Sequence, residues 1–316
     1  MHKQIESAVA LYSSGQVVKA LDIVKKLVTD YPNEPILHNL AGACYSAMGR
    51  YTSASNSYRN ALKINRDYVE VHNSLGVCLQ NLGSFEDAIK SFMNAITLNP
   101  NYAEAFNNLG NTYKELNQID DAINCYERSI AILPNYAFPY YNLGLIFHNK
   151  RELLKAIENY EKAININPEY YEAHNNLGGA LQYFGKMNLA IESYKRALKI
   201  KPDFFDAYIN LGVILTELER LNEAEINLKQ AIKINPKSAK AYNNIGNTYK
   251  DLGRFAEAEL NYRKAIELLP NYANAHNNLG IILFANGDLD ASLNSLEKAY
   301  SIEPESKLLL SVVGAK

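Results

Sequence analysis

A pattern of apolar residues at helical spacing recurs every 34 residues along the chain. Counted from Met1, positions 4, 7, 8 and 11 of each repeat fall at about 200°, 140°, 240° and 180° around a helix that turns by about 100° per residue. They form one stripe, which predicts an amphipathic first helix. A second helical period has an apolar residue at position 17, a small residue at position 20 and, in most repeats, an aromatic residue at position 24. Each repeat is therefore predicted to be two helices joined by a turn.

Three columns of residues fix the register of the repeat. Glycine occupies position 8, alanine position 20 and proline position 32 in almost every copy. Glycine at position 8 lets a second helix approach closely, and proline at position 32 stops the second helix because proline cannot continue one. The position-8 glycines after the first repeat are Gly42, Gly76, Gly110, Gly144, Gly178, Gly212, Gly246, Gly280 and Gly314.

The turn that ends each first helix depends on position 15, which is glycine in six repeats. Glycine adopts the left-handed conformation of a helix cap without strain. Asn117 is a tolerable substitute at this position. Arg151 and Glu219 are not, and we expect the turns at these two residues to be distorted.

The sequence Leu-Gly-x-x-Tyr, followed by Ala-x-x-x-Tyr and then Pro, resembles the tetratricopeptide repeat, a 34-residue helix–turn–helix unit. The resemblance covers essentially the whole chain and implies an all-α fold, a right-handed α-solenoid superhelix with the first helices on its concave surface. Neighbouring hairpins stack because none can bury its apolar face alone. Residues 307–316 continue the register as the start of a truncated tenth repeat or as a C-terminal cap. The nine predicted repeats are 1–34, 35–68, 69–102, 103–136, 137–170, 171–204, 205–238, 239–272 and 273–306.

Positions 2, 6, 9 and 13 form the face opposite the buried stripe, and position 6 of this face holds a column of six asparagines. Asparagine is less favourable than alanine in a helix interior by roughly half a kcal/mol, so such a column requires an explanation. Each carboxamide offers two donors and an acceptor, which match the amides of an extended peptide. With the asparagines at the adjacent position 5, the candidate peptide-binding residues are Asn107, Asn108, Asn111, Asn142, Asn175, Asn176, Asn210, Asn243, Asn244, Asn247, Asn277 and Asn278.

This asparagine ladder resembles the one in the superhelix of O-linked N-acetylglucosamine transferases, where the ladder grips the peptide backbone. A second interpretation is structural, because asparagine at position 6 is common in tetratricopeptide repeats and can bond the neighbouring backbone. The residues alone leave both interpretations open.

The charge balance argues against a nucleic-acid partner. The 316 residues carry a formal net charge of -2, whereas nucleic-acid binders carry a basic patch or stripe. We find no polybasic segment for a membrane surface, no apolar run long enough to span a bilayer and no signal peptide. Three cysteines form neither a disulfide framework nor a zinc spacing. We therefore expect a cytoplasmic protein with neither a nucleic-acid nor a membrane partner.

No motif for catalysis, metal binding or cofactor binding is recognisable, including phosphate loops, metalloprotease motifs and serine elbows. We therefore expect no enzymatic activity, no catalytic residue, no metal and no cofactor. Equivalent positions on stacked helices lie about 10 Å apart, which is too far for shared metal ligands. Cys125 replaces serine or asparagine at position 23 and is expected to be exposed. Rings that we expect to pack between helices occupy position 4, among them His38, His72, His174 and His276.

The predicted function is a protein–protein interaction scaffold that binds an extended peptide in a concave, asparagine-lined groove. One alternative is the substrate-recruiting arm of a larger transferase-type enzyme, whose catalytic domain would lie beyond residue 316. Another is a self-associating array, a homodimer, because Leu308, Leu309 and Leu310 would leave apolar surface exposed at the C-terminal edge.

Overall fold

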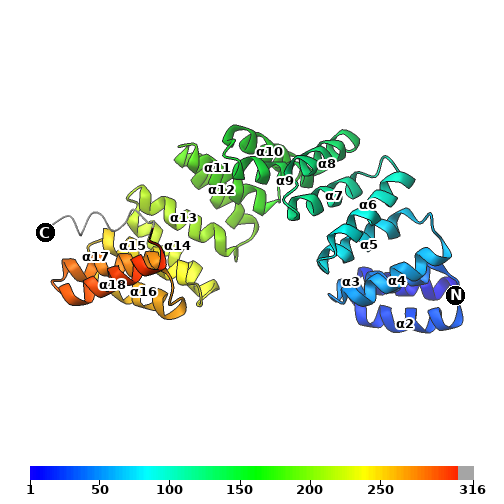
Figure 1. The fold of residues 1–316 in the computed structure, drawn as a ribbon, viewed down its shortest axis with the longest axis horizontal. Helices are drawn as coiled ribbons and strands as arrows, with labels where there is room; N and C mark the ends of the chain where they lie inside the picture. The colour runs from blue at the N-terminus through cyan, green and yellow to red at the C-terminus, as the bar shows by residue number, and fades with distance from the viewer. Residues whose placement is uncertain (305–316) are drawn as a thin grey trace. The chain divides into compact units, whose positions relative to one another are not determined.

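Residues 1–304 of the chain are described by the computed structural model, and they form eighteen α-helices and no strand (Figure 1). Each predicted repeat contains one pair, with a first helix of 12 or 13 residues and a second helix of 14 residues. The predicted all-α solenoid of helix–turn–helix repeats is confirmed. The expected tenth repeat, residues 307–316, lies outside the described residues.

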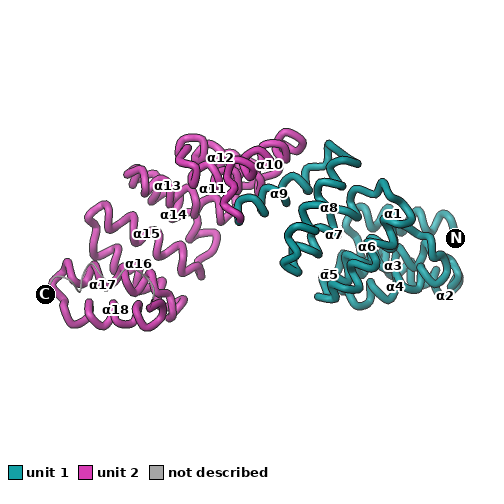
Figure 2. Tube along the Cα trace, turned by 45° about the horizontal axis from the view of Figure 1, so that its top comes forward, with its two compact units in different colours: residues 1–149 teal, residues 150–316 magenta. Residues whose placement is uncertain are grey.

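The chain divides into two compact units, residues 1–149 and 150–316 (Figure 2). Within each unit, the two helices of a repeat pack against each other, and the second helix also packs against the first helix of the next repeat. The first unit contains α1 (His2–Ser13), α2 (Val17–Asp30), α3 (Pro35–Ala47), α4 (Tyr51–Ile64), α5 (Val69–Asn81), α6 (Phe85–Leu98), α7 (Ala103–Glu115), α8 (Ile119–Ile132) and α9 (Ala137–Asn149). The second contains α10 (Leu153–Ile166), α11 (Tyr171–Tyr183), α12 (Met187–Ile200), α13 (Phe205–Glu217), α14 (Leu221–Ile234), α15 (Ala239–Asp251), α16 (Phe255–Leu268), α17 (Ala273–Ala285) and α18 (Leu289–Ile302).

In most repeats, the glycine at position 8 packs against the large side chain at position 24 in the core. A Cβ atom placed on Gly110 would lie only 2.7 Å from Cε1 of Tyr126, and Tyr126 itself is fully buried. The alanine at position 20, Ala122 in this repeat, is also fully buried. The close approach of the two helices at this glycine is therefore confirmed.

The turn at Glu219 keeps the regular geometry, so the expected distortion is wrong. Glu219 adopts a φ of 58°, and Arg151 one of 60°, in the same left-handed region as Gly253 at 73°. The backbone N–H groups of Glu219 and Arg220 donate to carbonyl groups near the end of α13, at 3.0 and 2.8 Å. Arg254, which follows Gly253, makes the same bond as Arg220. The turn is preserved because these bonds and the packing of both helices fix it, at the cost of a strained conformation for a side chain.

Hydrogen bonds from side chains to the backbone stabilise the turns between repeats. The Nε2 atom of His174 lies 3.0 Å from the carbonyl oxygen of Pro168, and His38 makes the same contact with Pro32 at 2.8 Å. Asn167 accepts a bond from the backbone N–H of Glu169 at 3.1 Å, which is an Asx turn. His174 is buried between helices as expected, and the bond to the preceding turn adds a link between repeats.

Cys125 is buried, which corrects the expectation that it is exposed. Only 9% of the residue is accessible, and it belongs to an apolar cluster with Phe92 and Leu109. Burial raises the pKa of the Cys125 thiol to about 11, with a smaller contribution from the charge of Asp121. Small polar residues at position 23 are therefore no sign of exposure, since Ser91 is buried at the same place in its repeat.

Candidate functional site

The candidate asparagines divide into two groups by burial. All lie on the first helices, from α7 to α17. The buried group contains the position-5 residues and one member of the position-6 column, namely Asn107, Asn142, Asn175, Asn243 and Asn277. The half-buried group contains Asn108, Asn111, Asn176, Asn210, Asn244, Asn247 and Asn278.

In the first unit, asparagines of successive repeats bond to one another. The amide group of Asn142 donates to Oδ1 of Asn107 at 3.1 Å and to Oδ1 of Asn111 at 3.0 Å. Asn107 donates in turn to Asn108 at 3.5 Å, and Asn108 donates to Asn73 at 3.1 Å. The carboxamides thus form a continuous chain of hydrogen bonds from α9 to α5.

The second unit repeats this arrangement with the same spacing along the sequence. Asn210 donates to Oδ1 of Asn175 at 3.1 Å, and Asn278 donates to Oδ1 of Asn243 at 3.0 Å. Asn278 also donates to Asn247 at 3.0 Å. A position-6 amide therefore bonds the position-5 asparagine 35 residues earlier and, where one is present, the position-9 asparagine 31 residues earlier.

The asparagines at position 9 have a further partner in the core. The hydroxyl group of Tyr126 donates to Oδ1 of Asn111 at 2.8 Å, and that of Tyr262 donates to Oδ1 of Asn247 at 2.8 Å. Burial of both phenols raises their pKa above the ordinary range. Each position-9 oxygen thus accepts two bonds and links the core to the asparagine column.

Neither interpretation of the sequence included hydrogen bonds between the carboxamide groups of successive repeats. We expected the asparagines to bind a peptide or to bond the neighbouring backbone, whereas many of them bond side chains of the preceding repeat. The signal was present as asparagines placed 35 residues apart, at positions 5 and 6 of successive repeats. The asparagine pairs form without a ligand. Each pair uses an amide hydrogen that could otherwise bond a ligand.

The ladder is interrupted at Asn244. The residues 35 and 31 positions earlier are Ile209 and Val213, which have no acceptor in their side chains. The Nδ2 atom of Asn244 is buried and has no hydrogen-bond partner within the described part of the chain. A buried donor without a partner costs roughly 1–3 kcal/mol, so this site is less stable than its paired counterparts.

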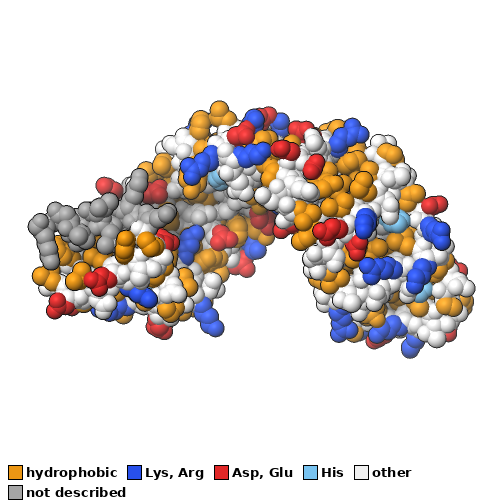
Figure 3. All heavy atoms as spheres, viewed as in Figure 1, with side chains coloured by type: hydrophobic (Ala, Val, Ile, Leu, Met, Phe, Trp, Pro, Cys, Tyr) orange, Lys and Arg blue, Asp and Glu red, His pale blue; other side chains and the backbone are white. Residues whose placement is uncertain are grey.

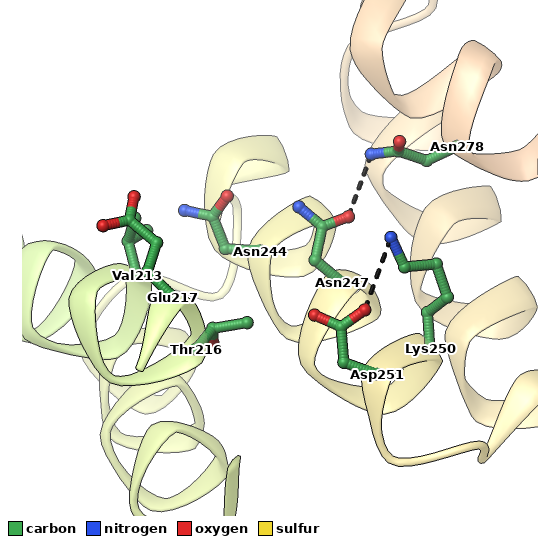
Figure 4. Close-up of a pocket in the computed structure, with 8 residues that line it drawn as sticks. All are labelled: Val213, Thr216, Glu217, Asn244, Asn247, Lys250, Asp251 and Asn278. Carbon is green, nitrogen blue, oxygen red and sulfur yellow. Dashed lines mark hydrogen bonds and ion pairs between the residues drawn. The ribbon is translucent and has the colours of Figure 1, made fainter. Parts of the chain in front are cut away.

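A polar pocket of about 290 Å³ lies at the interruption (Figure 4). The amide groups of Asn244 and Asn247 point from α15 toward the side of the pocket formed by α13 (Figure 4). Lys250 lies 3.4 Å from the carboxylate of Asp251, and Glu217 accepts a bond from Gln182 at 2.9 Å. The lining residues are Val213, Thr216, Glu217, Asn244, Asn247, Lys250, Asp251 and Asn278.

The surface around the helices carries charges of both signs. Basic and acidic side chains occur on both units in the face that Figure 3 shows. None of the described helices is both long and apolar enough to cross a lipid bilayer. Among residues 1–304, no group of three or more His, Cys, Asp or Glu side chains is placed to hold a metal ion.

Solved structures with a similar fold span different parts of the chain. The structure of the APC/C hetero-tetramer Cut9–Hcn1 is 18% identical and covers 88% of this chain and 54% of the other, with a TM-score of 0.64. MamA is 32% identical over 51% of this chain and 94% of its own, with a TM-score of 0.45. YrrB, described as a TPR protein with an unusual peptide-binding site, is 24% identical over 60% of this chain and 97% of its own, with a TM-score of 0.49.

A search among curated proteins gave no match. The family described as TPR repeat matches residues 42–83, 81–116, 110–150, 152–182, 184–218, 214–253 and 246–287. The family described as tetratricopeptide repeat matches residues 273–306. These matches cover most of the chain and agree with its helical pairs and their spacing. The chain belongs to the tetratricopeptide repeat family, whose arrays serve as scaffolds for protein–protein interaction.

Proposed function

We propose that this array binds an extended peptide along its first helices. The observation that carries the proposal is the polar pocket at Asn244, where a buried amide group has no partner among residues 1–304. A peptide main chain supplies a carbonyl group that can accept a bond from such a donor. The ligand is therefore a polypeptide segment whose main chain is not already bonded in a helix or sheet.

The spacing of the repeats supports an extended ligand. Packed helices lie about 10 Å apart, and an extended chain advances by about 3.3 Å per residue. One repeat therefore meets about three residues of the peptide, so side chains at equivalent positions contact the ligand at regular intervals. A helical segment rises only about 1.5 Å per residue and bonds its own carbonyl groups, which makes it a poor match.

The charges of the pocket add up to −1, which disfavours an acidic ligand group and accommodates a neutral one. Glu217 and Asp251 contribute two carboxylates and Lys250 one ammonium group. A strongly basic or acidic side chain would meet a like charge as well as an opposite one. A peptide amide is neutral and carries both a donor and an acceptor, and it matches a lining of mixed donors and acceptors.

A selection experiment tests the proposal. Random 12-residue peptides displayed on phage would be selected on the whole chain, and the affinity of the selected peptides measured by fluorescence anisotropy. Val213→Trp places a bulky ring at the half-buried edge of the pocket, and we expect it to abolish binding while circular dichroism and the thermal midpoint remain close to wild type. Failure to select any peptide, or full affinity in a folded Val213→Trp variant, contradicts the proposed function.

A further inference from the structure

We infer that the interruption of the asparagine ladder is the anchor point of the peptide, and that Ile209 and Val213 determine its position. The inference rests on the proposed peptide-binding function and specifies where and how the ligand is held. Asn244 donates to a main-chain carbonyl of the peptide because neither of these apolar residues offers it an acceptor. Ile209 and Val213 would therefore decide which repeat binds the peptide, although neither bonds the carbonyl group of the peptide.

Elsewhere in the column, the amide donors already have partners. Asn142 and Asn278 each donate to two asparagine oxygens of the preceding repeat. An amide group has two hydrogens, so these two residues have none left for a ligand. Asn210 donates one hydrogen to Asn175.

Asn244 itself has an unused donor. Among the described residues its Nδ2 atom is buried without a partner, so it has already lost its bonds to water. When the side chain turns into the pocket that it lines, a carbonyl oxygen can reach this donor without displacing an existing protein partner. The gain on binding is larger than at a donor that must first leave a neighbour or be dehydrated.

The surroundings of this donor offer further partners for a peptide. The pocket of about 290 Å³ opens between α13 and α15 beside Asn244 (Figure 4). Asn247 directs its amide group toward the same side (Figure 4), while its oxygen is occupied by Tyr262 and Asn278. Glu217 can accept from a peptide N–H group across the pocket. One peptide unit thus finds donors for its carbonyl and an acceptor for its N–H.

A substitution that repairs the ladder tests the inference without removing Asn244. In Val213→Asn, the new oxygen occupies the place that Asn247 occupies for Asn278, where the corresponding bond is 3.0 Å long. We expect this variant to be about as stable as wild type, because the buried donor gains a partner while the partly buried Val213 loses apolar contacts. We also expect the selected peptides to bind it several-fold more weakly, because one of the two amide hydrogens of Asn244 is then used. Asn244→Ala removes both hydrogens and should weaken binding further, by about tenfold.

Asn227→Ala is the matched control. Asn227 lies on the second helix α14, is half-buried and donates to the backbone of its own helix, at Glu223. It should bind the peptides with wild-type affinity. If peptides are selected and blocked by Val213→Trp but bind Val213→Asn and Asn244→Ala with wild-type affinity, the anchor is wrong and the proposed function stands. If no peptide binds the wild-type chain, the proposed function fails and the inference fails with it.

Discussion

Asn142 on α9 donates a hydrogen bond of 3.1 Å to the side chain of Asn107 on α7, and both side chains are buried. The two residues lie 35 positions apart in the sequence. The bond joins successive repeats through side chains alone. Removing one partner leaves the other buried and unsatisfied, which costs more than the bond itself is worth.

We therefore predict that Asn142→Ala lowers the stability of the array by about 1–3 kcal/mol, measured as a lower urea midpoint. Asn244→Ala is the matched comparison at the same position of its repeat. It removes a donor that has no partner, so its midpoint should equal or exceed that of wild type. Equal losses in the two variants would show that pairing along the ladder adds nothing to stability.

The turn at Glu219 provides a second prediction. Its φ of 58° costs a residue with a side chain about 1 kcal/mol, and glycine avoids this cost but has more entropy to lose on folding. We expect Glu219→Gly to stabilise the array by a net amount of about 0.5 kcal/mol. The reciprocal change Gly253→Ala should destabilise it by about 1 kcal/mol. Urea midpoints of both variants test this, and a destabilised Glu219→Gly protein would refute the account of the turn.

The contact between Gly110 and Tyr126 leads to a third prediction. A methyl group on Gly110 would lie 2.7 Å from the ring, and overpacking of this kind costs about 1–3 kcal/mol. Gly110→Ala should lower the thermal midpoint. In the background of Tyr126→Ala the same change should cost much less, because the ring is gone. Additive losses in this double-mutant cycle would mean that the glycine serves another purpose.

Thiol reactivity tests the burial of the cysteines. Cys44, Cys78 and Cys125 are all buried, and burial raises the pKa of each thiol, that of Cys125 to about 11. Because the thiolate is the reactive form, the folded protein should react slowly with Ellman's reagent at pH 8. Denaturation in urea should release all three thiols at once. Rapid reaction of one thiol in the folded protein would show that Cys125 is exposed after all.

Features set by single residues within one repeat could be predicted from the sequence. The glycine at position 8, the alanine at position 20 and the aromatic residue at position 24 act inside one helical pair, and Gly110, Ala122 and Tyr126 lie where the pattern places them. Helix ends follow from local stop signals such as proline. These features depend on periodicity, which a sequence displays directly.

Features that depend on the contact between repeats were harder to predict. The distortion expected at Glu219 was wrong because the packed helices and the backbone bonds on both sides hold the turn against the preference of one residue. Cys125 was misplaced because it packs into an apolar cluster that includes Phe92 of the preceding repeat. The pairing of Asn142 with Asn107 needs the register between two helices, which no single repeat contains.

The candidate asparagines lie on the predicted helices, but their partners were not predicted. The structure places all twelve candidates on first helices, where five are buried and seven are half-buried. It also divides them by their partners, since Asn142 and Asn278 donate to neighbouring asparagines while Asn244 has none. The difference arises because Ile209 and Val213, which lie 35 and 31 positions before Asn244, have apolar side chains that cannot accept a hydrogen bond.

The most direct test of the proposed anchor is the response of individual asparagine side chains to a bound peptide. A selected peptide would be titrated into nitrogen-15-labelled protein, and the side-chain amide signals followed by NMR after assignment through single Asn→Ala variants. We predict that the signal of Asn244 shifts and becomes protected from exchange, while that of Asn142, which does not line the pocket and donates both hydrogens to other asparagines, stays in place. A shift of Asn142 with an unchanged signal of Asn244 would contradict the proposed anchor.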